Sequence, residues 1–210
     1  MPTGSMHLGH KMVIDEVIYF QSLGAQVFIA VADIEAFGAR GIQLKEARER
    51  AINEYIVNYI ALGLKPERCE IYFQSKRKEV TDLAFIAARK VNLSTMRAIY
   101  GFEESTNMTH LFAPLIQVGD ILHVQLEQFG GPAPTLVPVG IDQDPHLRLT
   151  RDIASSLRKF SVKTTSDGKI GVFLKGSHST NQVQSILSRA KEKLEKLKQE
   201  QAKKLDERIA

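Results

Sequence analysis

The sequence lacks the features that mark several large protein classes. It holds a single cysteine, Cys69, which excludes a disulfide framework and a cysteine-rich zinc site within the chain and fits a reducing, intracellular setting. No apolar run reaches the length of a membrane span, and no signal peptide is visible. We therefore expect a cytoplasmic protein with no membrane partner.

Several catalytic motifs are also absent. The chain has no Walker-type Gly-Lys-Ser/Thr loop, no Gly-x-Gly-x-x-Gly fingerprint and no Gly-x-Ser-x-Gly elbow, so serine-nucleophile catalysis has no support. The histidines form neither a His-x3-His pair nor a compact cluster, so we predict no protein-held metal site. The net charge of +4 is concentrated in residues 189–210, which carry eight Lys/Arg against five Asp/Glu. A solvated helix is the simplest interpretation of that tail.

Apolar periodicity predicts alternating helices and strands. Strands are expected at 26–32, 69–74 and 135–139, and helices at 10–23, 44–62, 78–90, 93–100, 110–130 and 145–158. The first strand is apolar on both faces, which is typical of a parallel sheet. The order predicts an α/β, doubly wound (Rossmann-like) catalytic domain over 1–160 with a helical insertion at about 78–130. Residues 161–210 are expected to form a hairpin with an Asp-Gly turn and a long C-terminal helix.

The most informative motif is His-Leu-Gly-His, directly after a Pro-Thr-Gly-Ser turn and at the start of the first predicted helix. His7 and His10 would place imidazoles at a helix N-terminus, where phosphate oxygens are favoured. Gly9 has no Cβ, so a nucleotide can approach the backbone closely. The alternative is a pair of surface histidines at a helix cap.

Polar residues follow two of the predicted strands, where ligands sit in doubly wound sheets. Asp33 and Glu35 suit an ammonium group or a ring N–H, although Asp is also a good helix cap. Further along, Gly140, Asp142 and Gln143 could hold a ribose or a small substrate, or form a simple strand-to-helix turn.

Two polar residues interrupt the apolar stripe of the helix predicted at 110–130. Gln117 and Asp120 each need a partner there, either a ligand or a neighbouring backbone group.

Four segments together resemble the class I aminoacyl-tRNA synthetases, and more closely the archaeal and eukaryotic type of tryptophanyl-tRNA synthetase. They are residues 1–10, 32–36, 114–117 and 138–152. The run Asp-Gln-Asp-Pro-His followed by Arg-Leu-Thr-Arg-Asp is the specific part, because tyrosyl relatives share the His-x-Gly-His turn but lack this run. The resemblance covers roughly residues 1–158.

The resemblance implies ATP-dependent activation of tryptophan to tryptophanyl-adenylate and transfer to tRNA(Trp), with Mg²⁺ accompanying ATP. It also implies a homodimer whose interface lies in segment 78–130. By motif, ATP would be bound by Thr3, Gly4, His7, Gly9, His10, Gly140 and Asp142. The amino acid would be bound by Glu35, Gln117 and Gln143, and His7, His10 and Lys175 would stabilise the reacting phosphates.

Three departures from the family pattern accompany the resemblance. The family has a strand before the Pro-x-Gly turn, and this chain begins after the place expected for that strand. The family's eukaryotic members have Gln at the position where this chain has Ala30. The family's second signature, Lys-Met-Ser-Lys-Ser, is absent, and Lys175, Gly176 and Ser177 match it only weakly. We therefore expect a shortened, split or engineered form.

Two other functions remain open. One is a non-catalytic or partial fragment that binds tryptophan, nucleotide or a complementing chain. The other is an adenylyltransferase acting on a phosphorylated cofactor precursor, against which the Gly-Ile-Asp-Gln-Asp-Pro-His segment argues.

Overall fold

The computed structural model describes residues 1–158, 160–168, 170–174, 181–189, 191–192 and 195. The chain divides into two compact units, Met1–Ser156 and Leu157–Ala210. All of the expected site residues except Lys175 belong to the first unit. Lys175, with Gly176 and Ser177, lies outside the described residues.

The first half of unit 1 contains its paired strands. The elements are α1 (Leu8–Ser22), β1 (Val27–Val31), α2 (Asp33–Arg40), α3 (Leu44–Arg50), the π-helical segment η1 (Ala51–Ile56), α4 (Val57–Ala61) and β2 (Cys69–Phe73). Strands β1 and β2 are parallel, with Val27 opposite Cys69 and Val31 opposite Phe73. The strand predictions for 26–32 and 69–74 are confirmed, and segment 44–61 is helical throughout.

The second half of unit 1 is helical. It contains η2 (Gln74–Lys76), α5 (Lys78–Ala88), α6 (Leu93–Tyr100), α7 (Met108–His123), η3 (Glu127–Phe129), η4 (Ile141–Gln143) and α8 (Asp144–Leu157). Helices α5 and α7 pack closely at Gly119, where an added Cβ would lie 2.2 Å from the carbonyl oxygen of Val80. This contact buries Val80 and Ala84 against Leu115 and Val118 and forms much of the core beside the site.

The strand expected at 135–139 is wrong. Among the described residues of unit 1, only β1 and β2 form a sheet, and segment 132–140 runs without ladder hydrogen bonds. The physical reason is in the sequence: Pro132, Pro134 and Pro138 lack the backbone N–H that a ladder needs. Leu136 is accordingly 68% exposed. The predicted helix 110–130 is also too long, because α7 ends at His123.

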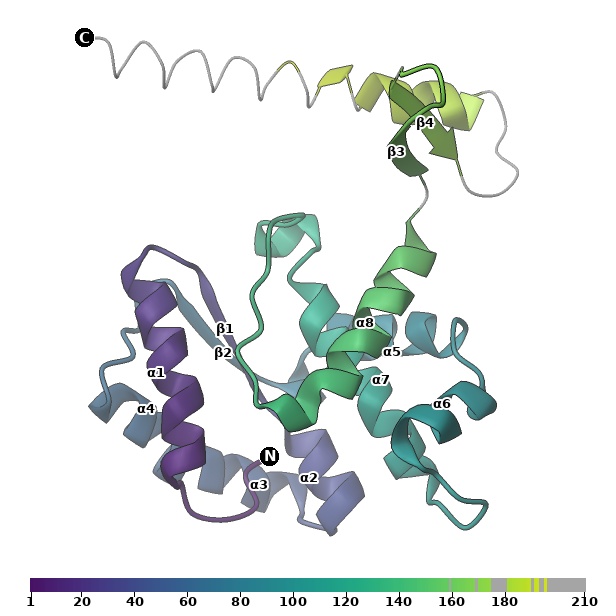
Figure 1. Ribbon diagram of the computed structural model, residues 1–210. Coiled ribbons are helices and arrows are strands. Elements are labelled where there is room, and N and C mark those ends of the chain that lie inside the picture. Colours follow the sequence, from purple (N-terminus) through teal and green to yellow (C-terminus); the bar gives the residue numbers. More distant parts are fainter. Residues whose placement is uncertain (159, 169, 175–180, 190, 193–194, 196–210) are drawn as a thin grey trace, which may run out of the picture. The chain divides into compact units, whose positions relative to one another are not determined.

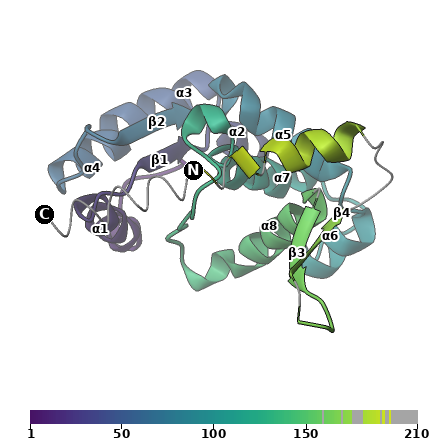
Figure 2. The same ribbon diagram turned by 90° about the horizontal axis from the view of Figure 1, so that it is seen from above.

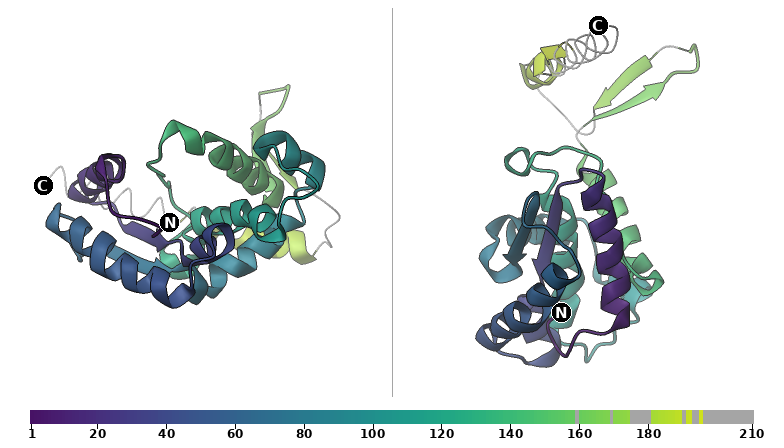
Figure 3. Two further views of the ribbon diagram at one scale, coloured as in Figure 1. Left: turned by 90° about the horizontal axis from the view of Figure 1, so that it is seen from below. Right: turned by 90° about the vertical axis from the view of Figure 1, so that its left-hand side faces the viewer.

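Helices cover both faces of the β1–β2 pair, as expected for a doubly wound α/β fold. Figures 2 and 3 show α1 on one side of the strands and α3 with α4 on the other. The N-terminal end of α1, the carboxyl ends of both strands and the start of α8 lie at the same end of the unit, the lower end in Figure 1. This arrangement gathers the segments that carry the expected site residues.

Unit 2 contains the expected hairpin. Strand β3 (Phe160–Thr164) pairs antiparallel with β4 (Ile170–Leu174), and Gly168 has φ +78° in the connecting turn. Residues 181–189 are helical, which agrees with the start of the predicted C-terminal helix. Among the described residues, no helix is both long and apolar enough to cross a membrane.

Candidate active site

The two N-terminal histidines cap helix α1 reciprocally. His7 Nδ1 accepts a hydrogen bond from the backbone N–H of Gly9 at 3.2 Å, and the N–H of His7 donates to His10 Nδ1 at 3.4 Å. A Cβ on residue 9 would lie 3.1 Å from the His7 ring, so the space that Gly9 leaves is used by this imidazole. The cap interpretation is therefore observed, at the helix end that favours anions.

Tyr55 holds the N-terminal turn in place. Its hydroxyl donates to the carbonyl oxygen of Gly4 at 2.6 Å, and the His10 ring packs edge-on against the Tyr55 ring with centroids 5.3 Å apart. Burial, aided by the neighbouring His7, lowers the pKa of His10, so this imidazole favours the neutral form. The sequence marked Tyr55 only as an apolar position of its helix, and its positioning role was missed.

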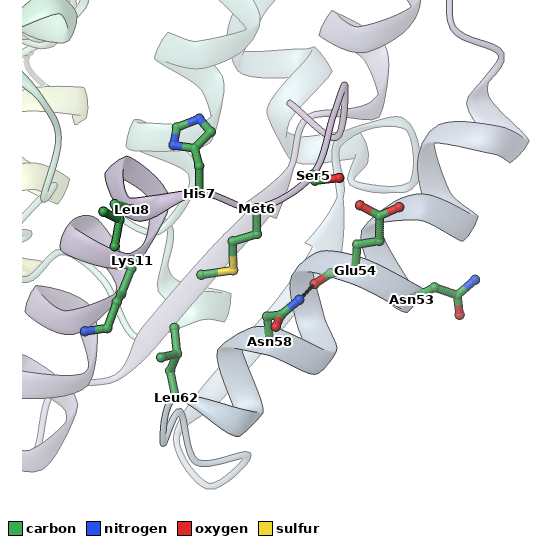
Figure 4. A pocket seen from close by; sticks show the side chains of 9 residues that line it. All are labelled: Ser5, Met6, His7, Leu8, Lys11, Asn53, Glu54, Asn58 and Leu62. Atoms are coloured by element: carbon green, nitrogen blue, oxygen red, sulfur yellow. Dashed lines mark hydrogen bonds between the residues drawn. The ribbon is translucent and has the colours of Figure 1, made fainter.

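A cavity of about 600 Å³ lies between the N-terminal turn and the helical segment η1–α4 (Figure 4). Its lining includes Met6, Leu62 and the carboxylate-bearing Glu54. The His7 ring points away from η1 and α4 in Figure 4. Of the expected site residues only His7 lines this cavity, and its charged lining residues are Lys11 and Glu54. It is therefore separate from the amino-acid cluster described next.

Asp33 joins the ends of the two strands. Its fully buried carboxylate accepts from the N–H of Ser75 at 3.0 Å and from Nε of Arg48 at 2.9 Å. A buried carboxylate paired in this way is satisfied by the protein itself. Asp33 thus fixes α2 against β2 and α3, and it leaves Glu35, two residues later, as the carboxylate available to a ligand.

A buried group of acceptors lies where α2, β2 and α7 meet. The side-chain amide of Gln74 donates to Glu35 Oε1 at 2.8 Å and to Asp120 Oδ2 at 2.5 Å. The Tyr72 hydroxyl donates to Asp120 Oδ1 at 2.8 Å. Asp120 is therefore held by two side chains, and neither of the two expected partners, a ligand or a neighbouring backbone group, is the one observed. Burial raises the pKa of Glu35 and raises that of Asp120 to about 7.

The expected amide pair is in contact. Gln117 Nε2 donates to Gln143 Oε1 at 3.2 Å, and Gln143 Nε2 donates to Asp142 Oδ2 at 2.7 Å. Gly140 makes room for this turn, since a Cβ there would lie 2.5 Å from Asp142 Oδ1. Gln117 and Asp120 are three residues apart on α7 and share one face of it. The Gln117–Gln143–Asp142 chain and the Glu35–Gln74–Asp120 group therefore each have a member on this face of α7.

The structure also reveals two contributors that sequence reasoning missed, Tyr72 and Gln74. A glutamine directly after an apolar strand was the available signal for Gln74, because the carboxyl end of a strand is where ligands gather. Two buried atoms in this region, Gln74 Oε1 and His123 Nε2, have no hydrogen-bond partner among the described residues. Such atoms are rare in native structures and point to a missing donor or acceptor.

The chain has relatives of known function. It matches the family model described as "tRNA synthetases class I (W and Y)" over residues 1–193. It is 57% identical over 176 residues to the tryptophan–tRNA ligase of Thermoplasma volcanium, an alignment that covers 84% of this chain and 40% of that protein. Identity to the tryptophan–tRNA ligase of Methanocaldococcus jannaschii is 52% over 162 residues, which cover 76% of this chain and 44% of that protein.

A solved structure agrees with these sequence matches. The tryptophanyl-tRNA synthetase of Aeropyrum pernix K1 superposes with a TM-score of 0.72 at 44% identity, over 83% of this chain and 46% of that chain. The chain thus spans less than half the length of the relatives it matches. The family model covers most of its residues, and the shared fold is α/β and Rossmann-like. The chain therefore belongs to the class I tRNA synthetases of tryptophan and tyrosine, on the tryptophanyl branch.

Proposed function

We propose that the chain carries the tryptophan-activating site of a tryptophan–tRNA ligase. Such an enzyme condenses tryptophan with ATP to tryptophanyl-adenylate and pyrophosphate, and then transfers the aminoacyl group to tRNA(Trp). The observation that carries the proposal is the buried acceptor group at the carboxyl ends of the strands. Glu35 belongs to this group, and the Gln117–Gln143 pair shares helix α7 with its member Asp120, in a chain 57% identical to a tryptophan–tRNA ligase.

In this proposal the amino acid is bound by Glu35, Gln117 and Gln143. Carboxylate and amide oxygens suit the ammonium group and the indole N–H of tryptophan. These three side chains are half-buried, and their partial shielding from water strengthens hydrogen bonds to a ligand. The group has no resident cation among its described contacts, which leaves its negative charge for the ligand.

The nucleotide is bound by the N-terminal turn and by the turn before α8. The residues proposed for ATP are Thr3, Gly4, His7, Gly9, His10, Gly140 and Asp142, with Lys175 on the phosphates. The backbone N–H of Gly9 donates its hydrogen bond to His7 Nδ1. A phosphate oxygen that takes this N–H must therefore displace the imidazole, which then becomes free to contact the phosphate itself.

Mg²⁺ fits this site as an ion carried by the substrate. Among the described residues, no group of three or more His, Cys, Asp or Glu side chains could hold a metal. Mg²⁺ in ATP-dependent enzymes is usually held largely by phosphates and waters, so a protein cage is not required. We further propose that the protein acts in the cytoplasm as a homodimer.

Tryptophan-dependent exchange of pyrophosphate into ATP tests the proposal. We expect exchange with tryptophan in a panel of amino acids, and loss of exchange in His10→Ala. The chain contains no tryptophan, so binding can be followed separately through the fluorescence of the ligand. Binding without exchange above the His10→Ala level would contradict catalysis and favour the partial-fragment alternative. Exchange driven only by another amino acid would contradict the assigned substrate.

A further inference from the structure

The hydrogen bonds of Gln74 to neighbouring residues involve only one end of its side-chain amide. Gln74 directly follows β2 and is 1% exposed. Its single amide nitrogen contacts carboxylates from two helices, Glu35 on α2 and Asp120 on α7. Its oxygen, Oε1, is buried and has no hydrogen-bond partner within the part of the chain that the structure describes. The amide nitrogen of Gln74 thus makes two hydrogen bonds, whereas its amide oxygen makes none to the described residues.

The chemistry of the two carboxylates fixes the orientation of the amide. Above the pKa of Asp120 both carboxylates are ionised and only accept hydrogen bonds, so the NH₂ group of Gln74 faces Glu35 and Asp120. Its two hydrogens can serve both carboxylates at once, which a hydroxyl cannot do. Oε1 must then face the other way, and its burial without a donor is costly unless a ligand supplies one.

We infer that Gln74 is a positioning residue that holds Glu35 and Asp120 in one acceptor wall, and that its Oε1 accepts a hydrogen bond from an N–H group of tryptophan. This inference rests on the proposed function and extends it. Every free atom of the wall is an acceptor, so the ligand group that it fits is an N–H donor. Tryptophan offers two such groups, the ammonium and the indole N–H.

The charges around Asp120 make this role measurable. Asp120 is faced by Glu35 and Asp33 from α2 and by the Tyr72 hydroxyl from β2, and Glu70 and His123 are neighbours of Tyr72. Arg77 lies over the Tyr72 ring at 4.4 Å and pairs with Glu70. Burial and the neighbouring carboxylates raise the pKa of Asp120 to about 7, and the hydrogen bond from Gln74 opposes this rise.

Removal of the Gln74 amide should therefore raise the pKa of Asp120 further. An N–H donor binds the ionised carboxylate better, so tryptophan affinity should rise with pH as Asp120 loses its proton. In Gln74→Met the midpoint of this rise should lie at higher pH than in the wild-type chain. A purely structural glutamine would change stability without moving that midpoint.

The experiment compares Gln74→Met with Gln21→Met in the full chain. Gln21 is also buried, and its amide is satisfied by backbone groups of Lys65 and Glu67 away from the site. Tryptophan dissociation constants are measured by ligand fluorescence from about pH 5 to about pH 9, a range that brackets the raised pKa of Asp120. We expect Gln74→Met to weaken binding about tenfold above neutral pH and to shift the midpoint upward, and Gln21→Met to change neither.

A conservative variant covers the case in which Gln74→Met does not fold. Gln74→Glu keeps the length of the side chain and keeps one O–H donor while it is protonated. We expect binding between the wild-type and Met levels at low pH, and loss of this rescue as residue 74 ionises. Wild-type affinity and an unmoved midpoint in both variants would overturn the inference, as would an equal loss in Gln21→Met.

Two analogues identify the donor. Indole-3-propionate keeps the indole N–H and lacks the ammonium, whereas benzothienylalanine keeps the ammonium and replaces the N–H by sulfur. The analogue whose affinity is insensitive to Gln74→Met is the one that lacks the group bound by Oε1. Equal sensitivity of tryptophan and both analogues would overturn the direct contact.

The failure of the proposed function can be told apart from the failure of this inference. The carboxyl carbon of Asp120 can be titrated by NMR without any ligand. If wild-type chain binds no tryptophan, the proposed function and the role of Oε1 both fail. An upward pKa shift of Asp120 in Gln74→Met would still support the positioning of the two carboxylates, and an unchanged pKa would overturn that as well.

Discussion

At the scale of single residues, many side chains of the site already form hydrogen bonds with one another. His7 and His10 cap a helix, and Gln117 and Gln143 share a hydrogen bond. A ligand must exchange with these contacts, so binding replaces hydrogen bonds and does not simply add them. Residues whose groups are exchanged should affect ligand binding more than stability.

Gly9→Ala tests this at the nucleotide end. Ala is favoured over Gly in a helix by about 1 kcal/mol, but its Cβ would lie 3.1 Å from the His7 ring and disturb the cap. We expect the two effects on the free energy of unfolding to offset within about 1 kcal/mol, while pyrophosphate exchange falls because the backbone is obstructed. Gly4→Ala, with open space around its Cβ, is the control for stability. Undiminished exchange in Gly9→Ala would contradict the role of this glycine.

Asp120 should make the free energy of unfolding depend on pH. The pKa of Asp120 is raised from the ordinary carboxyl value to about 7. At a pH between these two values, Asp120 holds a proton in the folded chain but has released it in the unfolded chain. This contribution is fully present below the unfolded pKa and is lost as the pH rises through the folded one. Asp120→Asn should gain stability relative to the wild-type chain as pH rises, by at most about 1.4 kcal/mol per pH unit. Urea unfolding at a series of pH values measures the difference, and parallel curves would refute it.

At the scale of elements, a buried ion pair ties the strand ends together. Asp33 at the start of α2 is fully buried, whereas its partner Arg48 on α3 is partly exposed. Arg48→Met would leave the carboxylate buried without its cation, and we expect a loss of about 3 to 5 kcal/mol in the free energy of unfolding. Arg50→Met is matched in exposure, but its partner Glu46 is largely exposed, so we expect less than about 1 kcal/mol there. Denaturant titration compares the two, and equal losses would contradict the argument.

The elements also show what the sequence could and could not predict. Apolar runs predicted β1 and β2, because a buried strand has a local signature. Segment 135–139 had the same signature, but its flanking and internal prolines prevent a ladder. Gln117 and Gln143 were predicted from motifs and do meet. Gln74 was missed, because its contact with Asp120 joins residues 46 apart and leaves no periodic trace.

At the scale of the whole molecule, segment 78–130 is where we propose the homodimer interface. Segment 78–130 exposes several large apolar side chains on its helices, namely Phe85, Ile86, Leu93 and Met108. Phe85, 68% exposed, packs against Phe112 with ring centroids 5.5 Å apart and so forms part of a joint apolar surface. Exposed apolar surface of this kind marks interaction sites. It supports the proposal that a second copy of the chain covers this segment.

Phe85→Glu tests the proposed homodimer, because a carboxylate on a covered apolar face is costly. We expect light scattering to give a dimer mass for the wild-type chain and a monomer mass for the variant at the same concentration. Ile141→Glu is the control, since Ile141 is 94% exposed and lies outside the segment. A dimer that survives Phe85→Glu would place the interface elsewhere, and a monomeric wild-type chain would contradict the homodimer. Tryptophan binding should survive Phe85→Glu, because the acceptor group is formed by Glu35, Gln74 and Asp120 within one copy.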